Sequence, residues 1–141
     1  MDKIFRYSLL KYRPSAVLDE QVNVGILFIF LGDNKVTFLF PQSLNRLNAL
    51  YPDIDLQDTK QYLYAIQEKA NQLARKDLAV ETAADNFIDK AFFLADANSF
   101  FFSEFKAGIY ETNSIDKIIQ HFSQQYFKAY NNNVPLEPVK Y

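Results

Sequence analysis

The sequence predicts one α+β domain: an antiparallel sheet of about four strands, made of an N-terminal three-strand meander and a late fourth strand, packed by about three helices. Two patterns predict it. Residues 4–40 contain segments rich in β-branched and aromatic side chains that alternate with the period of a strand. Most of the later chain repeats its apolar residues at helical spacing, and a phenylalanine-rich segment returns near residue 100. Strands followed by helices are typical of the α+β class.

Length and composition indicate a single domain with an aromatic core. The chain has 141 residues, a common size for one domain, and 49% of them are hydrophobic. Its 14 phenylalanines and 9 tyrosines predict an interior filled largely by rings. We expect residues 1–130 to form this domain and residues 131–141, which contain Pro135 and Pro138, to form a C-terminal tail.

Three strands are expected in the N-terminal meander, over residues 4–13, 20–31 and 35–40. Residues 14–19, which begin with a proline, break the first hairpin, and a Gly-Asp-Asn turn at residues 32–34 separates the second strand from the third. On the second strand, the period of two assigns one face to Val22, Val24, Ile26, Phe28 and Phe30, and the other to Gln21, Asn23, Gly25, Leu27 and Ile29. Because the second face also becomes apolar, this strand is expected to be central and covered on both sides.

The later elements are a series of helices interrupted by one strand. Helices are predicted over residues 43–51, from a cap at Asp55 or Asp58 to residue 76, and over residues 82–96. Residues 98–105 are predicted to be the fourth strand. A last helix is expected after a cap at Thr112 or Ser114, because its apolar residues form a stripe at three- and four-residue spacing.

Charge and residue usage exclude several classes of function. The net charge is −2, with 15 basic against 17 acidic residues, so no overall field favours nucleic acid. The absence of cysteine excludes disulfides and sulfur-ligated metal sites. The N-terminus lacks the apolar core of a signal peptide, and the longest apolar run, Val24 to Leu31, is far shorter than the roughly 20 residues of a membrane helix. We therefore expect a cytoplasmic protein that does not enter the membrane.

No recognised catalytic or cofactor-binding motif is present. The 3 glycines are scattered, so no phosphate-binding loop is formed, and no carboxylate spacing resembles a calcium loop. The single histidine, His121, has no partner that the sequence identifies, and a surface position is the simpler interpretation. We expect no cofactor and no metal, and we favour a non-enzymatic role.

One end of the first hairpin gathers polar residues on otherwise apolar strands, and it is the candidate functional surface. Asn23 is the least expected of them, since asparagine is disfavoured in strands, and Gly25 nearby would let a backbone or a ligand approach closely. Asn23 either fixes the neighbouring loop by hydrogen bonds or contacts a ligand. If the fourth strand lies beside this hairpin, Glu104 and Arg13 could form an ion pair or the rim of a site.

Three segments resemble a known family. Residues 7–14 (YSLLKYRP) and 20–26 (EQVNVGI) resemble the opening of the bacterial family catalogued as domain of unknown function 3037, and residues 98–104 (NSFFFSE) are similar to its second block. The likeness spans residues 5–127. The apolar loop at residues 16–18 departs from the charged stretch usual in that family.

The resemblance implies family-like polar residues and a class of partner, but no activity. The polar and aromatic positions it carries over are Tyr7, Tyr12, Arg13, Glu20, Asn23, Ser99 and Glu104. With Lys11, the polar positions define the candidate functional surface: Lys11, Arg13, Glu20, Asn23, Ser99 and Glu104. Members are often encoded beside HipA-like kinases, so the resemblance implies a kinase-like protein partner or a regulatory role.

Three functions remain open at this point. The first is a non-enzymatic accessory or protein-interaction module of a bacterial regulatory or defence-type system, partnered with a HipA-like kinase or with further copies of itself. The second is a nucleic-acid-binding domain that uses the basic and aromatic residues of the first strand, at residues 5–7 and 11–13. The third is a hydrolase or nuclease with a carboxylate site around Glu20 and Glu104.

Overall fold

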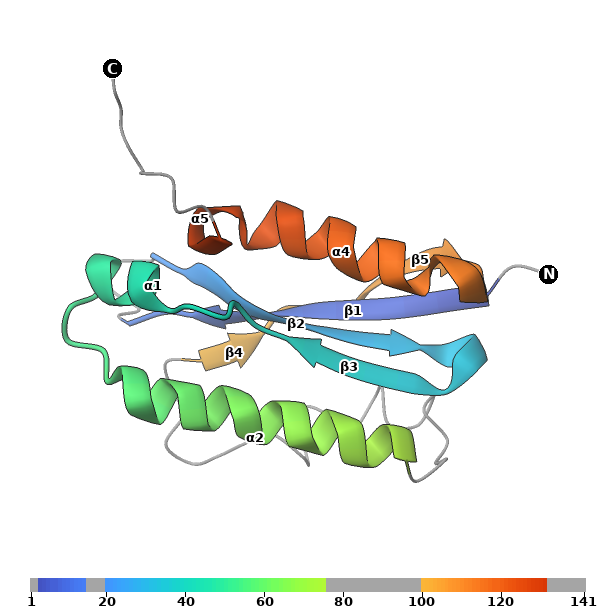
Figure 1. Ribbon diagram of the computed structural model, residues 1–141, viewed down its shortest axis with the longest axis horizontal. Helices are drawn as coiled ribbons and strands as arrows, with labels where there is room; N and C mark the ends of the chain where they lie inside the picture. The colour runs from blue at the N-terminus through green and yellow to red at the C-terminus, as the bar shows by residue number, and fades with distance from the viewer. Residues whose placement is uncertain (1–2, 15–19, 76–99, 132–141) are drawn as a thin grey trace, which may run out of the picture.

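The computed structural model shows an antiparallel sheet with helices on both faces (Figure 1). It describes residues 3–14, 20–75 and 100–131. The strands are β1 (Lys3–Tyr12), β2 (Val22–Phe30), β3 (Lys35–Leu39), β4 (Phe100–Phe102) and β5 (Lys106–Tyr110). The helices are α1 (Asn45–Leu50), α2 (Leu56–Arg75), α4 (Ile115–Tyr126) and α5 (Lys128–Asn131). The predicted fold class, an α+β domain with an antiparallel sheet, is confirmed.

β1 pairs with three of the other four described strands. The order is β3-β2-β1-β4, and β5 pairs with the same side of β1 as β4, closer to the start of β1. The meander of β1, β2 and β3 therefore forms as predicted. β2 lies between two strands, and every residue from Val24 to Phe30 is buried, so the prediction of a central strand covered on both sides is confirmed.

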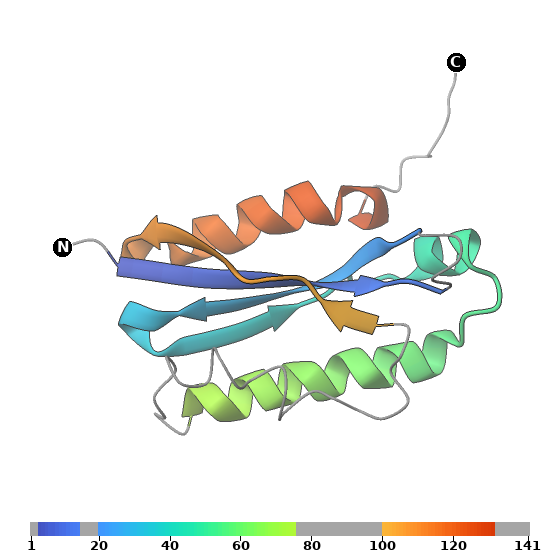
Figure 2. The same ribbon diagram turned by 180° about the vertical axis from the view of Figure 1, so that it is seen from behind.

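Two cores lie on the two faces of this sheet, and Figure 2 shows the helices that cover them from behind. On one face, α2 and α1 pack on the cluster Leu10, Tyr12, Val24, Leu27, Ile29, Val36, Phe38, Leu44, Leu47, Leu63, Ile66 and Ala70. On the other, α4 packs on Phe5, Leu9, Ile26, Phe28, Phe30, Tyr110, Ile115 and Phe127. The second core is an aromatic lattice, in which the Phe28 ring contacts the rings of Phe5, Phe30 and Phe122 at centroid distances of 5.3–6.4 Å.

A bulge in β2 corrects the predicted faces of that strand. Leu10 is opposite Gly25 and Lys11 is opposite Asn23, so Val24 is an extra residue between two pairs. An extra residue moves the side chains before it to the opposite face of the sheet from the one that strict alternation predicts. Val22 and Val24 accordingly pack on the α2 face with Leu27 and Ile29, and the prediction that they share a face with Ile26, Phe28 and Phe30 is wrong.

The predicted fourth strand is confirmed as β4, although it is shorter than predicted, and a second bulge separates it from a fifth strand, β5, that was not predicted. β1 has two residues, Ser8 and Leu9, between the pairs with β4 and β5, whereas the other strand has three, at 103–105. Ser103 holds this bulge: its N–H donates to the Leu9 carbonyl at 2.8 Å and its Oγ accepts from the Leu9 N–H at 3.0 Å. Buried Ser8 donates to the Ser103 carbonyl at 2.6 Å. β5 was not predicted because Lys106 and Gly108 weaken its strand pattern.

The helix boundaries follow the predictions except at the last cap. Asp55 caps α2, since its Oδ1 accepts the Asp58 N–H at 3.0 Å. Ser114 is the N-cap position of α4, as one of the two predictions had it, but its side chain makes no capping hydrogen bond, because its Oγ bonds to Glu111 instead. The Thr112 hydroxyl donates to Asp33 and does not cap the helix. The predicted helix at 82–96, and all of the predicted tail except Asn131 at the end of α5, lie outside the described residues.

Candidate functional site

The bulge in β2 places three of the predicted surface residues on one face. Asn23 of β2 and Phe101 of β4 are both directly opposite Lys11 of β1, and side chains that face each other across antiparallel strands point to the same side. Because Leu10 packs in the α2 core, its neighbour Lys11 points to the α4 side. Arg13 lies on the same side, with its guanidinium 4.9 Å from the centre of the Phe101 ring. We call Lys11, Arg13, Asn23 and Phe101 the cationic row.

The cationic row combines unengaged polar groups with a stacked arginine. All four residues are partly buried. The side chains of Lys11 and Asn23 make no hydrogen bond or ion pair within the part of the chain that the structure describes. The Arg13 guanidinium lies over an aromatic face, which holds the cation in place while leaving its edge N–H groups available. The row therefore presents ammonium, guanidinium and amide donors along one end of the sheet.

The other predicted site residues do not join this row. Glu20 lies on the α2 side, where the Tyr51 hydroxyl donates to its Oε1 at 3.5 Å and the Tyr51 ring contacts Tyr12 at 5.3 Å. Glu104 is exposed on the bulge beside β1, and it makes no ion pair with Arg13 among the described residues. Ser99 lies outside the described residues.

The two carboxylates of the hydrolase hypothesis are far apart. Glu104 lies opposite Ser8 and Leu9 of β1, whereas Glu20 precedes Val22, the partner of Tyr12. The register thus separates them by about five residues along β1, or roughly 15 Å. One hydrogen-bonded catalytic unit made from both is not formed.

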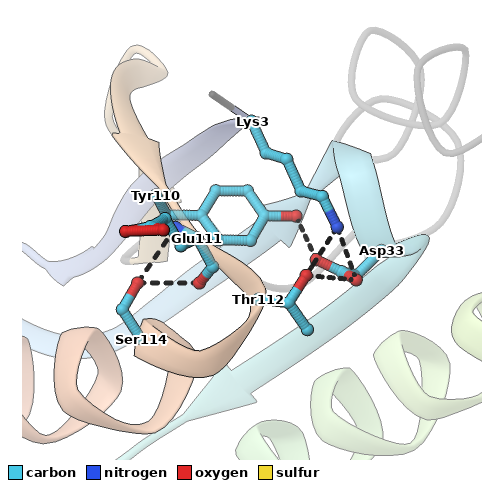
Figure 3. A network of polar contacts seen from close by, with 6 residues as sticks. All are labelled: Lys3, Asp33, Tyr110, Glu111, Thr112 and Ser114. Atoms are coloured by element: carbon cyan, nitrogen blue, oxygen red, sulfur yellow. Dashed lines mark hydrogen bonds and ion pairs between the residues drawn. The ribbon is translucent and has the colours of Figure 1, made fainter. Parts of the chain in front are cut away.

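A second polar cluster, at the opposite end of the sheet, is fully engaged with itself (Figure 3). Asp33, in the turn between β2 and β3, accepts from Lys3 Nζ at 3.2 Å, from the Tyr110 hydroxyl at 2.7 Å and from Thr112 Oγ1 at 3.0 Å. Lys3 Nζ also donates to Thr112 Oγ1. These four residues tie the start of β1, the β2–β3 turn and the end of β5 together. A ligand would have to displace contacts that are already made, so the role of this cluster is structural. We call Lys3, Asp33, Tyr110 and Thr112 the closure, because together they hold one end of the sheet.

The same closure fixes the entry into α4. The Glu111 N–H donates to Ser114 Oγ at 3.0 Å, and this hydroxyl donates back to the Glu111 carbonyl at 2.7 Å, as Figure 3 shows. The reciprocal bonds close the 3₁₀ turn that follows β5. α4 therefore starts at a fixed angle to the sheet, with Ile115 buried in the aromatic core.

The closure shifts the pKa values of two of its members in opposite directions. The hydrogen bond from Tyr110 is the largest cause that lowers the pKa of Asp33, and Lys3 and Thr112 add to it. Burial, followed by the neighbouring Asp33 carboxylate, raises the pKa of Tyr110 from 10.0 to about 12. Both pKa shifts favour the state in which Asp33 is ionised and Tyr110 is protonated.

These shifts predict two separate limbs in the pH dependence of stability. A carboxyl whose pKa is lowered by folding stabilises the fold above its unfolded pKa, near 3.8, and this stability is lost as the pH falls through the folded pKa. A tyrosine whose pKa is raised stabilises the fold below pH 10.0, and this stability is lost as the pH rises towards 12. In urea unfolding across this pH range, Asp33→Asn should flatten the acid limb and Tyr110→Phe the alkaline limb. Unchanged limbs in both variants would contradict the closure.

The histidine and the described helices add no further site. His121 is exposed on α4, with its ring edge-to-face against Phe122 at 6.0 Å, in agreement with the surface position predicted for it. In the described parts of the chain, no three His, Cys, Asp or Glu side chains gather in a way that could hold a metal ion. None of the helices described there is long and apolar enough to cross a membrane.

Comparison with known proteins gives a family. The family model described as "Protein of unknown function (DUF3037)" matches residues 7–125. The chain belongs to this family. The resemblance noted in the sequence is thereby confirmed, over almost the span expected for it. No curated protein and no solved structure matches the chain significantly.

The DUF3037 match can be placed on the structure. It begins in β1 at Tyr7 and ends in α4, so it includes all four residues of the cationic row, whereas Lys3 of the closure precedes it. Sequence reasoning had missed Phe101 as a member of the row, and it had missed the whole closure except for Asp33 as a turn residue. The only sequence signal for Phe101 was its place in an aromatic segment.

Proposed function

We propose that this DUF3037 protein is a non-enzymatic protein-interaction module that holds an acidic segment of a partner protein on its cationic row. The row carries this proposal, since Lys11, Arg13 and Asn23 present donors on one face without a carboxylate among them. Carboxylates bind such donors through charge-assisted hydrogen bonds, and a stacked guanidinium loses little side-chain freedom when it does so.

A protein partner fits the row better than a nucleic acid does. Single-stranded nucleic acid would use exposed aromatic faces for base stacking. On β4 and the bulge beside it those faces carry cations, with Arg13 over Phe101 and Arg6 over Phe105 at 5.1 Å. The net charge of −2 also opposes long contacts with phosphates.

The partner class suggested by the family resemblance is a HipA-like kinase of a bacterial regulatory or defence-type system. In this proposal the module contributes recognition and the partner contributes chemistry. A kinase surface rich in Asp and Glu would complement the row, and charges of opposite sign would speed the encounter.

Reversing the charge of the row tests the proposal. A tagged chain purified gently from its native cells should recover a specific partner, and Lys11→Glu with Arg13→Glu should reduce that recovery at least about tenfold, since each lost charge-assisted contact is worth roughly 1 kcal/mol or more. The matched control is Lys60→Glu with Lys69→Glu, two exposed lysines of α2, which should leave recovery unchanged.

Nuclease treatment of the same lysate separates the two classes of partner. A partner protein that is retained after nuclease digestion and lost in the row variant supports the proposal. Recovery of the chain alone contradicts it, and so does a partner whose retention depends on intact nucleic acid.

A further inference from the structure

The sheet has two outer edges, and they are protected differently. At the β3 edge, Gln67 of α2 donates its side-chain N–H to the Phe38 carbonyl at 3.2 Å. On the other side, the bulge at 103–105 interrupts the edge beside β4, as bulges commonly do where a sheet must not pair further. β5 pairs with β1 along one side, and no described segment pairs with its other side. Its five residues form a regular edge that could accept another strand.

The exposed face beside this edge is apolar. Ile4 and Ile109 are directly opposite each other on β1 and β5, and they remain 50% and 67% exposed. Ile109 is the most exposed large hydrophobic side chain in the described residues. Ala107, two residues away on the same face, is also exposed. Isoleucines exposed at a sheet edge are typical of a strand that pairs with another chain.

We propose that β5 pairs with β5 of a second copy of this chain, antiparallel and centred on Gly108. In that register Lys106 faces Tyr110 of the second copy and Ala107 faces its Ile109, so that all five residues of each strand are paired. The two exposed isoleucine pairs then form one apolar stripe across the junction. The inference concerns a surface separate from the cationic row and does not depend on the proposed function.

Charge complementarity supports this register. It sets Glu111 of one copy opposite Phe105 of the other, one residue beyond the paired strands, where the backbone of Glu111 is still extended (φ −119, ψ 152). The Arg6 guanidinium lies 5.1 Å from the centre of the Phe105 ring. Each Glu111 thus arrives beside a cation of the other copy, and the two-fold symmetry repeats the contact.

The pairing is short, and this sets its expected strength. Two five-residue strands and their isoleucines bury less than the roughly 1,200 Å² of a standard interface. We therefore expect a dissociation constant in the micromolar range, and a dimer that forms as the protein concentration is raised.

Sedimentation over a concentration series tests the dimer. Wild-type chain should pass from monomer to dimer, and Ile109→Lys, a change at an exposed position, should weaken the dimer at least about tenfold by placing two ammonium groups in the apolar stripe. Leu50→Lys, at a leucine 48% exposed on α1, is the matched control and should dimerise as wild type does. A chain that stays monomeric at every concentration, or a dimer that Ile109→Lys leaves intact, overturns the inference.

Cysteine cross-linking tests the register, because the chain has no cysteine of its own. A mixture of Ala107→Cys and Ile109→Cys chains should form a disulfide-linked dimer under mild oxidation, and each variant alone should form much less. Equal cross-linking in all three samples overturns the register. If both proposals hold, Ile109→Lys still recovers the partner protein, and Lys11→Glu with Arg13→Glu still dimerises. The failure of one proposal is therefore distinguishable from the failure of the other.

Discussion

Leu27→Ala is expected to lower the free energy of unfolding by roughly 3–5 kcal/mol. Leu27 is 0% exposed, lies opposite Phe38 across β2 and β3, and packs in the core beneath α2. Its truncation loses the transfer free energy of the side chain and leaves a cavity, because neighbouring strands on both sides prevent collapse.

The control for this change is the same substitution at an exposed position. Leu50→Ala, on α1 where the leucine is 48% exposed, should cost less than about 1 kcal/mol. Urea unfolding monitored by circular dichroism measures both. Equal losses in the two variants would mean that β2 is not the covered, central strand described above.

Gly25→Ala is expected to destabilise the fold by roughly 1–3 kcal/mol, although it adds a single methyl group. A Cβ at this position would lie 2.7 Å from Phe38 Cε1 and still closer to its Cζ. Phe38 is 1% exposed, so its ring cannot turn towards solvent. The glycine in the bulge therefore provides room for a core ring, and the approach of a ligand suggested by the sequence does not occur on this face.

A double-mutant cycle identifies this contact as the cause. Phe38→Leu removes the ring edge that the new methyl group meets, so the two changes together should cost at least about 1 kcal/mol less than the sum of the single changes. Strict additivity of Gly25→Ala and Phe38→Leu would contradict the packing described here.

Local patterns in the sequence predicted the elements but not the two bulges. The alternation of β2 is a property of one strand, whereas the position of its extra residue depends on how Leu10 and Lys11 pair with it. Gly25 was the only local sign of irregularity. The consequence is large, because the bulge places Asn23 on the side of Lys11 and sends Val22 and Val24 to the opposite core.

The candidate site was predictable only where its residues are close in sequence. Lys11, Arg13 and Asn23 come from one hairpin, and their grouping was predicted; Phe101 joins them through a pairing that no local pattern shows. The closure around Asp33 joins residues separated by 30 to 109 positions, and each of them has an ordinary local explanation as a turn, strand or cap residue. Only the tertiary arrangement shows that they belong together.

The cationic row is tested most directly by measuring how the affinity for the copurified partner protein depends on salt. Charge-assisted contacts at a partly exposed surface weaken as salt screens them, over a distance of about 10 Å at 0.1 M ionic strength. The row as described predicts a dissociation constant that rises steeply with salt for the wild-type chain and much less steeply after Lys11→Glu with Arg13→Glu. An affinity that is independent of salt, or equally dependent in both proteins, would contradict it.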